Sequence, residues 1–192
     1  MLALAPVVAG LLLGWLTGGQ LRAIAAARFR RGWVLLLGAA AGGCHSHWDA
    51  ARHATERIHV PLLALSYLAL AAWGVLNLAH VPPHMSRSVA MVGTGAMLNA
   101  AVITVNGRMP VATSVLGQPA RDFAQLSDKH EQMTPSTGLP WLGDVMPMAG
   151  GHLMVSLGDI LLVFGCVMLL SAMMRRPSAA RHRREKHGGR TP

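Results

Sequence analysis

The sequence has 192 residues, of which 52% are hydrophobic and only 13% are charged, and its mean hydropathy is +0.39. This composition is too apolar for an ordinary soluble domain of this length. The formal net charge of +9 does not indicate nucleic-acid binding, because the basic residues follow apolar runs or lie in the C-terminal tail and form no single folded face. We therefore expect membrane lipids, and no nucleic acid, among the partners.

Five apolar runs approach or reach the roughly 20 residues that a helix needs to cross a bilayer core. The alternating pattern of a transmembrane β-barrel is absent. The fold class predicted is an all-α integral membrane bundle in one domain, residues 1–176, and prolines or an Asn-Gly pair close two of its helices. The predicted spans are residues 2–19, 33–48, 60–81, 88–105 and 153–174.

The 17 Lys and Arg residues divide unequally between the two sides of such a bundle. Four lie in the 20–32 linker, one in the 82–87 turn and seven after Met174, against five in the remaining loops. Basic residues favour the cytoplasmic side. We therefore expect a multi-pass protein of the bacterial inner membrane with its N-terminus outside and a disordered basic tail, residues 177–192, in the cytoplasm.

Glycines recur at every fourth position in the first two predicted helices. Gly10, Gly14 and Gly18 form one such series, and Gly38 with Gly42 forms another. Small residues at this spacing let helix backbones approach closely. The simplest interpretation is a hairpin of the first and second helices, and a homodimer through the Gly10 face is the alternative.

Polar residues in the third, fourth and fifth apolar runs fall at matching depths. Ser66, Asn99 and Asp159 each lie six residues from the predicted outer end of their helix, or about 9 Å below the boundary at 1.5 Å per residue. A carboxylate facing lipid costs roughly 3 kcal/mol, so Asp159 needs polar neighbours. The three residues either hydrogen-bond to one another and fix the helix register, or form the floor of a polar pocket open to the outside.

The predicted outer loop, residues 106–152, is too long for a simple connection and is expected to be partly folded. Asn106 and Gly107 predict a turn, and an extended stretch follows from Met109. The LPWLGDVMPM segment, with Trp141, suits a lid at the membrane interface. The pocket candidates are Asn99, Asn106, Asp159, Ser66 and Ser156, with Lys129, His130 and Asp144 at the rim.

Several spaced blocks in the second half of the chain occur in a recognisable order: NGRMPV at 106–111, DKH at 128–130, LPWLGDV at 139–145 and SLGD at 156–159. In these blocks the sequence resembles a bacterial family of small multi-pass membrane proteins that is classified as a domain of unknown function. The resemblance implies a five-helix membrane protein with a structured outer loop. It implies no chemistry.

Acid-base chemistry is open to Asp144, Asp159, Lys129 and His130, but no nucleophile motif accompanies them. A second polar cluster occupies residues 45–59, where His45, Asp49 and His53 would share one face of a helix. Such a face could bind Zn²⁺, but an interfacial polar helix with i, i+4 pairs explains it without metal and is favoured. We expect no cofactor and no metal here.

The sequence favours a binding or accessory protein whose partner is an envelope protein or a lipid-like ligand. A membrane-embedded hydrolase or transferase for a lipid-linked substrate is the first alternative, with Asp144 or Asp159 as the base. A small ion or proton carrier through Asp159 is the second. The inner half of the last helix offers it no other ionisable group, and Asn77 is the one polar relay candidate.

Overall fold

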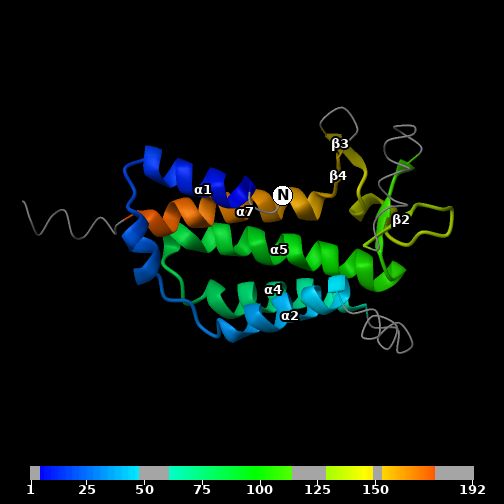
Figure 1. The fold of residues 1–192 in the computed structure, drawn as a ribbon, viewed down its shortest axis with the longest axis horizontal. Coiled ribbons are helices and arrows are strands. Elements are labelled where there is room, and N and C mark those ends of the chain that lie inside the picture. The colour runs from blue at the N-terminus through cyan, green and yellow to red at the C-terminus, as the bar shows by residue number, and fades with distance from the viewer. Residues whose placement is uncertain (1–4, 48–60, 114–128, 149–152, 176–192) are drawn as a thin grey trace, which may run out of the picture.

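The computed structural model describes residues 5–47, 61–113, 129–148 and 153–175, and the fold is mostly helical (Figure 1). The predicted tail at 177–192 lies outside the described residues. Short 3-10 helices, η2 (Leu21–Ala26) and η4 (Pro140–Leu142), and four short strands connect the main helices. The five main helices are α1 (Ala5–Leu16), α2 (Trp33–His47), α4 (Leu62–Leu78), α5 (Pro83–Asn106) and α7 (Leu157–Met174).

The five main helices lie side by side in the order α2, α4, α5, α7, α1 (Figure 1). Helix α5 is at the centre because it packs against both α4 and α7, while α2 covers α4 and α1 covers α7. The bundle has two ends. We call one the strand end, where α5 ends and α7 begins beside the four strands, and the other the arginine end, where η2 lies, α5 begins and α7 ends.

Helix boundaries differ most from the predicted spans at two places, the starts of α5 and α7. Helix α5 begins at Pro83, five residues before the predicted start, because proline is well suited to the first position of a helix. The fifth span was expected to be helical from residue 153, but Leu153–Val155 is a strand, β4, and α7 begins only at Leu157. Asp159 therefore lies in the first turn of its helix and not six residues inside it.

Glycines bring neighbouring helices close, but not in the predicted pairs. Gly10 of α1 packs against α7, where an added Cβ would lie 2.9 Å from Leu170 Cβ. Gly38 of α2 packs against α4, where an added Cβ would lie 3.1 Å from Ser66 O. The predicted hairpin of the first and second helices through these glycines is therefore wrong, because α7 packs on the glycine face of α1 and α4 packs on that of α2.

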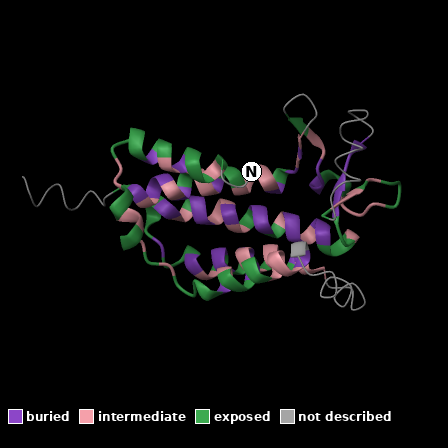
Figure 2. Cartoon of the chain, in the orientation of Figure 1, coloured by how far each residue is buried: buried purple, intermediate pink, exposed green. Residues whose placement is uncertain are grey.

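Burial increases toward the centre of the row (Figure 2). Helix α5 contributes ten buried residues, whereas α1 buries only Gly10 and Gly14 and exposes leucines and valines along its length. By length and composition, α5 and α7 could each cross a membrane, and the other three main helices are apolar but shorter. A mostly helical fold is thus confirmed, with two candidate membrane spans among the described residues.

The long loop after α5 contains two small sheets that an all-α prediction does not include. Strand β1 (Met109–Val111) pairs in parallel with β2 (His130–Gln132), and β3 (Met146–Met148) pairs antiparallel with β4 (Leu153–Val155). The extended stretch predicted from Met109 is confirmed. The β3–β4 pair leads the chain back to α7, so the loop closes over the strand end of the bundle (Figure 1).

Candidate functional site

Strand β1 holds the two sides of the candidate site in place. On one side it pairs with β2, and on the other it forms a bridge with Asp144. The backbone N–H of Asp144 donates to Pro110 O at 2.8 Å, and the N–H of Ala112 donates to Asp144 O at 3.0 Å. Because both neighbours of β1 are fixed by backbone hydrogen bonds, His130 on β2 and Asp144 face each other across a short distance.

His130 and Asp144 form the first pair of the site. His130 Nε2 lies 3.4 Å from Asp144 Oδ2, and the side chains are 19% and 2% exposed, respectively. Burial raises the pKa of Asp144 from 3.8 to about 6; the hydrogen bond from His130 opposes this rise and the charge of Asp159 adds to it. The other Asp144 oxygen, Oδ1, is buried and has no hydrogen-bond partner among the described residues.

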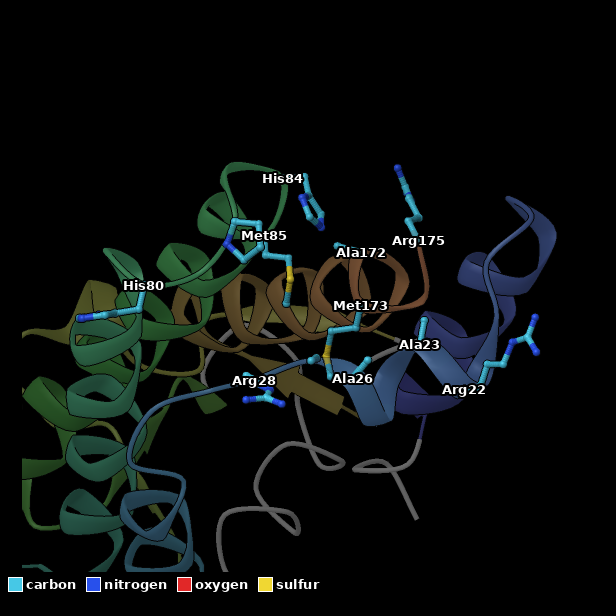
Figure 3. Close-up of a pocket in the computed structure, with 12 residues that line it drawn as sticks. Arg22, Ala23, Ala26, Arg28, His80, His84, Met85, Ala172, Met173 and Arg175 are labelled. Atoms are coloured by element: carbon cyan, nitrogen blue, oxygen red, sulfur yellow. The ribbon is translucent and has the colours of Figure 1, made fainter. Parts of the chain in front are cut away.

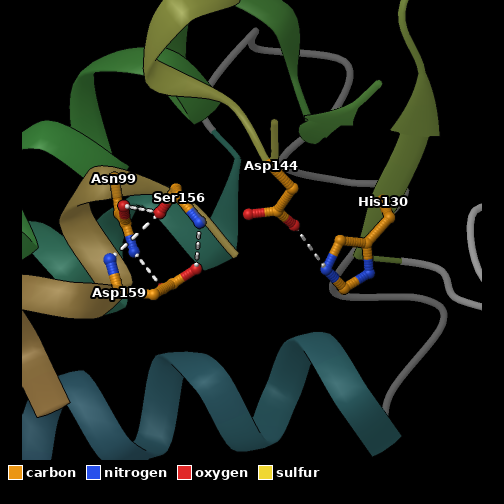
Figure 4. A network of polar contacts seen from close by, with 5 residues as sticks. All are labelled: Asn99, His130, Asp144, Ser156 and Asp159. Carbon is orange, nitrogen blue, oxygen red and sulfur yellow. Dashed lines mark hydrogen bonds and ion pairs between the residues drawn. The ribbon is translucent and has the colours of Figure 1, made fainter. Parts of the chain in front are cut away.

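A closed ring of hydrogen bonds joins Asn99, Ser156 and Asp159 (Figure 4). Asn99 Nδ2 donates to Asp159 Oδ1 at 2.7 Å, and Ser156 Oγ donates to Asn99 Oδ1 at 3.1 Å. The Ser156 and Asp159 side chains also accept from each other's backbone N–H groups at 3.0 and 3.1 Å. This reciprocal pairing is a capping box at the start of α7.

The ring requires α5 and α7 to approach closely, and glycine makes that possible. A Cβ added at Gly158 would overlap Asn99 Oδ1, and one added at Gly95 would lie 2.6 Å from Gly158 O. Both glycines are buried. The Asn99 amide can therefore reach the N-terminal start of α7 only because position 158 carries no side chain.

The Asp144 carboxyl lies between His130 and this ring (Figure 4). The Asp159 charge raises the Asp144 pKa, and a hydrogen bond between the two carboxyl groups, which forms when one of them is protonated, raises it further. The arrangement thus places a carboxyl group with a pKa near 6 between a partly exposed imidazole and a second carboxylate. It can accept hydrogen bonds through Asp144 Oδ1, and the partly exposed His130 lies between the carboxyl and the surface.

Tyr67 joins the site and Ser66 does not, although the sequence interpretation named only Ser66. The Ser66 hydroxyl donates to Leu63 O at 2.7 Å within its own helix, and Ser66 faces α2, beside Gly38 and Gly42. The Tyr67 hydroxyl interacts with Asn99 and with the Asp159 and Asp144 charges. Counting residues from the outer end of α4 identifies the turn that lies level with Asn99. Consecutive residues of a helix point about 100° apart, so the packing of α4 decides which residue of that turn faces the site.

Asn106 was also predicted to line the pocket, but its side chain holds the loop. Its amide donates to Val102 O at 2.8 Å and to Gly138 O at 2.9 Å, while Asn106 Oδ1 accepts from the N–H of Gly138 at 2.8 Å. Gly107 follows with a φ of 85°, which ends α5. Lys129 is exposed, and its carbonyl accepts from the N–H of Met109 at 2.9 Å.

The metal candidates near residue 45 remain a prediction. His45 is buried on α2, and Asp49 and His53 lie outside the described residues. Within the part of the chain that the structure describes, no three His, Cys, Asp or Glu side chains are grouped so that they could hold a metal ion.

Comparison with known proteins identifies a family. A model for a family of unknown function, DUF5317, matches residues 26–171. This range includes α2, α4, α5, the loop with its four strands and most of α7. No curated protein and no solved structure matches the chain significantly.

Proposed function

The chain belongs to DUF5317, a family of unknown function, and we propose that it is a multi-pass membrane protein that binds a ligand at its strand end. The strand end faces the outside of the bacterial cytoplasmic membrane. The site is the Asp144 carboxyl, supported by His130 and Asp159. Its role is that of a binding or accessory protein, and its ligand is lipid-like, with N–H or O–H donors in the headgroup.

The distribution of exposed side chains supports membrane insertion. The five main helices contain only two charged residues: Arg87, the fifth residue of α5, and Asp159, the third residue of α7. Exposed tryptophans lie at both ends: Trp15 and Trp33 toward the arginine end, and Trp141 at the strand end. Tryptophan at the two ends of an apolar bundle is the pattern of a membrane-embedded protein.

Charge supports the orientation. Arg22, Arg28, Arg30, Arg31, Arg87 and Arg175 lie at the arginine end, and the described strand end has Arg108 and Lys129 together with three acids, Glu131, Asp144 and Asp159. The positive-inside rule then places the arginine end in the cytoplasm. Helix α1 runs parallel to α7, since Gly10 meets Val167 and Gly14 meets Ser171, so its N-terminus would lie outside.

One observation carries the ligand proposal: when Asp144 is ionised, its buried Oδ1 has no hydrogen-bond donor among the described residues. Leaving a buried polar atom unsatisfied costs about 1–3 kcal/mol, and a ligand donor would recover that energy. Asp159 is less suited to bind the ligand directly. Its two oxygens already accept from Asn99 and from the N–H of Ser156.

An enzyme is the second candidate, and the Asp144 pKa favours it over the carrier. A carboxyl group with a pKa of about 6 beside an imidazole is suited to acid-base work near neutral pH. A proton carrier would need a relay farther along the bundle. Asn77 is a poor relay because its side chain bonds to the backbone of Arg30 and to Trp73 O.

Native mass spectrometry of the full-length protein, extracted gently from its own membrane, tests the proposal. The variant Asp144→Asn keeps the shape of the side chain but removes one acceptor and the charge. Glu131→Gln is the matched control, because Glu131 lies on β2 next to His130 and has no part in the ring. We expect a bound ligand on the wild type and on Glu131→Gln and its loss from Asp144→Asn; equal retention by all three would refute the site.

A further inference from the structure

A cleft of about 620 Å³ lies at the arginine end, far from the Asp144 site. Its wall is formed by η2, by the turn between α4 and α5, and by the last turn of α7 (Figure 3). The floor is apolar: Met85 and Ala172 are buried, and Met173 is partly buried beside them. This volume falls within the range of small-molecule and cofactor pockets, about 300–1,000 Å³.

The rim of the cleft is strongly basic. Arg22, Arg28 and Arg175 are exposed there, and His84 adds a titratable ring (Figure 3). Arg22 Nε donates to Gln20 Oε1 at 2.8 Å, and one N–H of Arg175 donates to Ser171 Oγ at 3.2 Å. A guanidinium has five N–H donors, so each of these arginines retains donors for a ligand.

No carboxylate among the described residues lies near this rim. The three described acids, Glu131, Asp144 and Asp159, are all at the strand end. The positive charges around the cleft are therefore not neutralised by described acidic side chains. The complement of such a rim is an anion, and the complement of the floor is a hydrocarbon chain.

The fold holds the wall of the cleft in place. The buried Asn77 accepts from the N–H of Arg30 at 2.7 Å and donates to Arg30 O at 3.0 Å, which fixes the 27–32 linker against α4. Gln20 N–H donates to Met174 O at 2.9 Å, which fixes the start of η2 to the end of α7. The cleft is therefore bounded by segments that are tied to the bundle at both ends of η2.

We propose that this cleft binds one anionic phospholipid of the inner leaflet. The anionic headgroup lies at the basic rim, which Arg22, Arg28 and Arg175 border from different sides (Figure 3), and the upper part of an acyl chain covers Met85 and Met173. Guanidinium groups bind phosphate oxygens through paired, charge-assisted hydrogen bonds, and basic pockets on the cytoplasmic side of membrane proteins bind anionic headgroups. The proposal rests on the membrane insertion proposed above but not on the Asp144 site.

The test uses the delipidated full-length protein in mild detergent, titrated with phosphatidylglycerol or with phosphatidylcholine and followed by native mass spectrometry. We expect one phosphatidylglycerol to be retained in preference to phosphatidylcholine. Arg28→Gln and Arg175→Gln should each weaken its binding about tenfold, the loss expected for one charged hydrogen-bonded contact. Arg87→Gln is the matched control, because it removes one arginine charge at the same end and Arg87 does not line the cleft. The affinity of this variant for phosphatidylglycerol should change less than twofold.

A second variant tests the apolar floor without changing charge. Ala26 is exposed and lines the cleft, so Ala26→Leu should fill space, fold normally and weaken lipid binding. Excess inorganic phosphate should not displace the lipid. Three results would each overturn the proposal: displacement of the lipid by phosphate alone, equal retention of phosphatidylcholine and phosphatidylglycerol, or an equal loss of phosphatidylglycerol binding in Arg87→Gln and Arg28→Gln.

The strand-end site and the lipid cleft can be refuted independently of each other. Asp144→Asn should leave phosphatidylglycerol binding unchanged, because Asp144 lies at the other end of the bundle. If the arginine variants lose lipid while Asp144→Asn loses no ligand, the cleft stands and the strand-end site does not. The reverse result would keep the strand-end site and discard the cleft.

Discussion

Two asparagines, one toward each end of the bundle, are both fully buried and yet serve different purposes. Asn99 hydrogen-bonds to side chains of α7, including the Asp159 carboxylate. Asn77 hydrogen-bonds only to backbone groups, those of Arg30 and Trp73. The comparison teaches that burial of a polar residue does not by itself identify a site: Asn99 takes part in a charged cluster, whereas Asn77 fixes a linker.

The two ends also differ in where their remaining polar groups lie. At the strand end the group without a hydrogen-bond partner among the described residues is internal, Asp144 Oδ1. At the arginine end the arginines are exposed around an apolar cleft. The first arrangement suits a ligand that brings a donor into a buried place, and the second suits an anion that arrives from the membrane surface.

The largest expected effect is at the contact between α5 and α7. Gly158→Ala places a Cβ on Asn99 Oδ1, so it should overpack the interface and break part of the ring, at a combined cost of about 4 kcal/mol. Unfolding of the purified protein in SDS, followed by circular dichroism, measures it. Gly43→Ala is the control, since nothing lies near an added Cβ there; a similar loss in both variants would mean that helix flexibility, and not the ring, is responsible.

The next effect is a pH dependence specific to the strand end. Folding raises the pKa of Asp144 from 3.8 to about 6, so in this window the folded state binds more protons than the unfolded state. Stability should therefore fall as pH rises from about 4 to 6, by roughly 3 kcal/mol for a shift of this size. Unfolding curves of Asp144→Asn should lack this component, and an unchanged pH profile in that variant would argue against a raised pKa.

At the arginine end, Asn77→Ala should destabilise the protein by about 2 kcal/mol, because Arg30 loses both side-chain hydrogen bonds to its backbone. The 27–32 linker should become more open to hydrogen exchange, while amides near Asn99 keep their protection. Mass spectrometry of exchanged peptides reads both regions in one experiment. Deprotection at the strand end as well would show that the two ends are coupled.

The smallest expected change in stability comes from removing the serine hydroxyl that caps α7. Ser156→Ala removes the cap of α7 and should cost about 1 kcal/mol. Ser86→Ala removes a serine hydroxyl inside the first turn of α5, where it caps no helix and donates to Pro83 O at the surface, so stability should hardly change. Thermal unfolding of the two variants side by side is sufficient; equal melting temperatures would contradict the role of the capping box.

Much of the fold follows from the sequence because helix ends are marked locally. Pro82 and Pro83 separate α4 from α5, and Asn106 with Gly107 ends α5. The start of α7 lies later than predicted. Leu153, Met154 and Val155 are apolar and continuous with the helix behind them, and only pairing with β3 makes them a strand.

Composition and local patterns predicted the helical class, the apolar runs, the unequal distribution of Lys and Arg between the two ends, and Asn99, Asp159, His130 and Asp144 as chemically capable residues. Which of these side chains meet depends on how the helices and strands pack. The tertiary structure chose Tyr67 over Ser66, used Asn106 to hold the loop, and paired α1 with α7 and not with α2. The physical reason is that composition and local signals act along the chain, whereas helix rotation, strand pairing and close packing at glycines depend on partners far away in sequence.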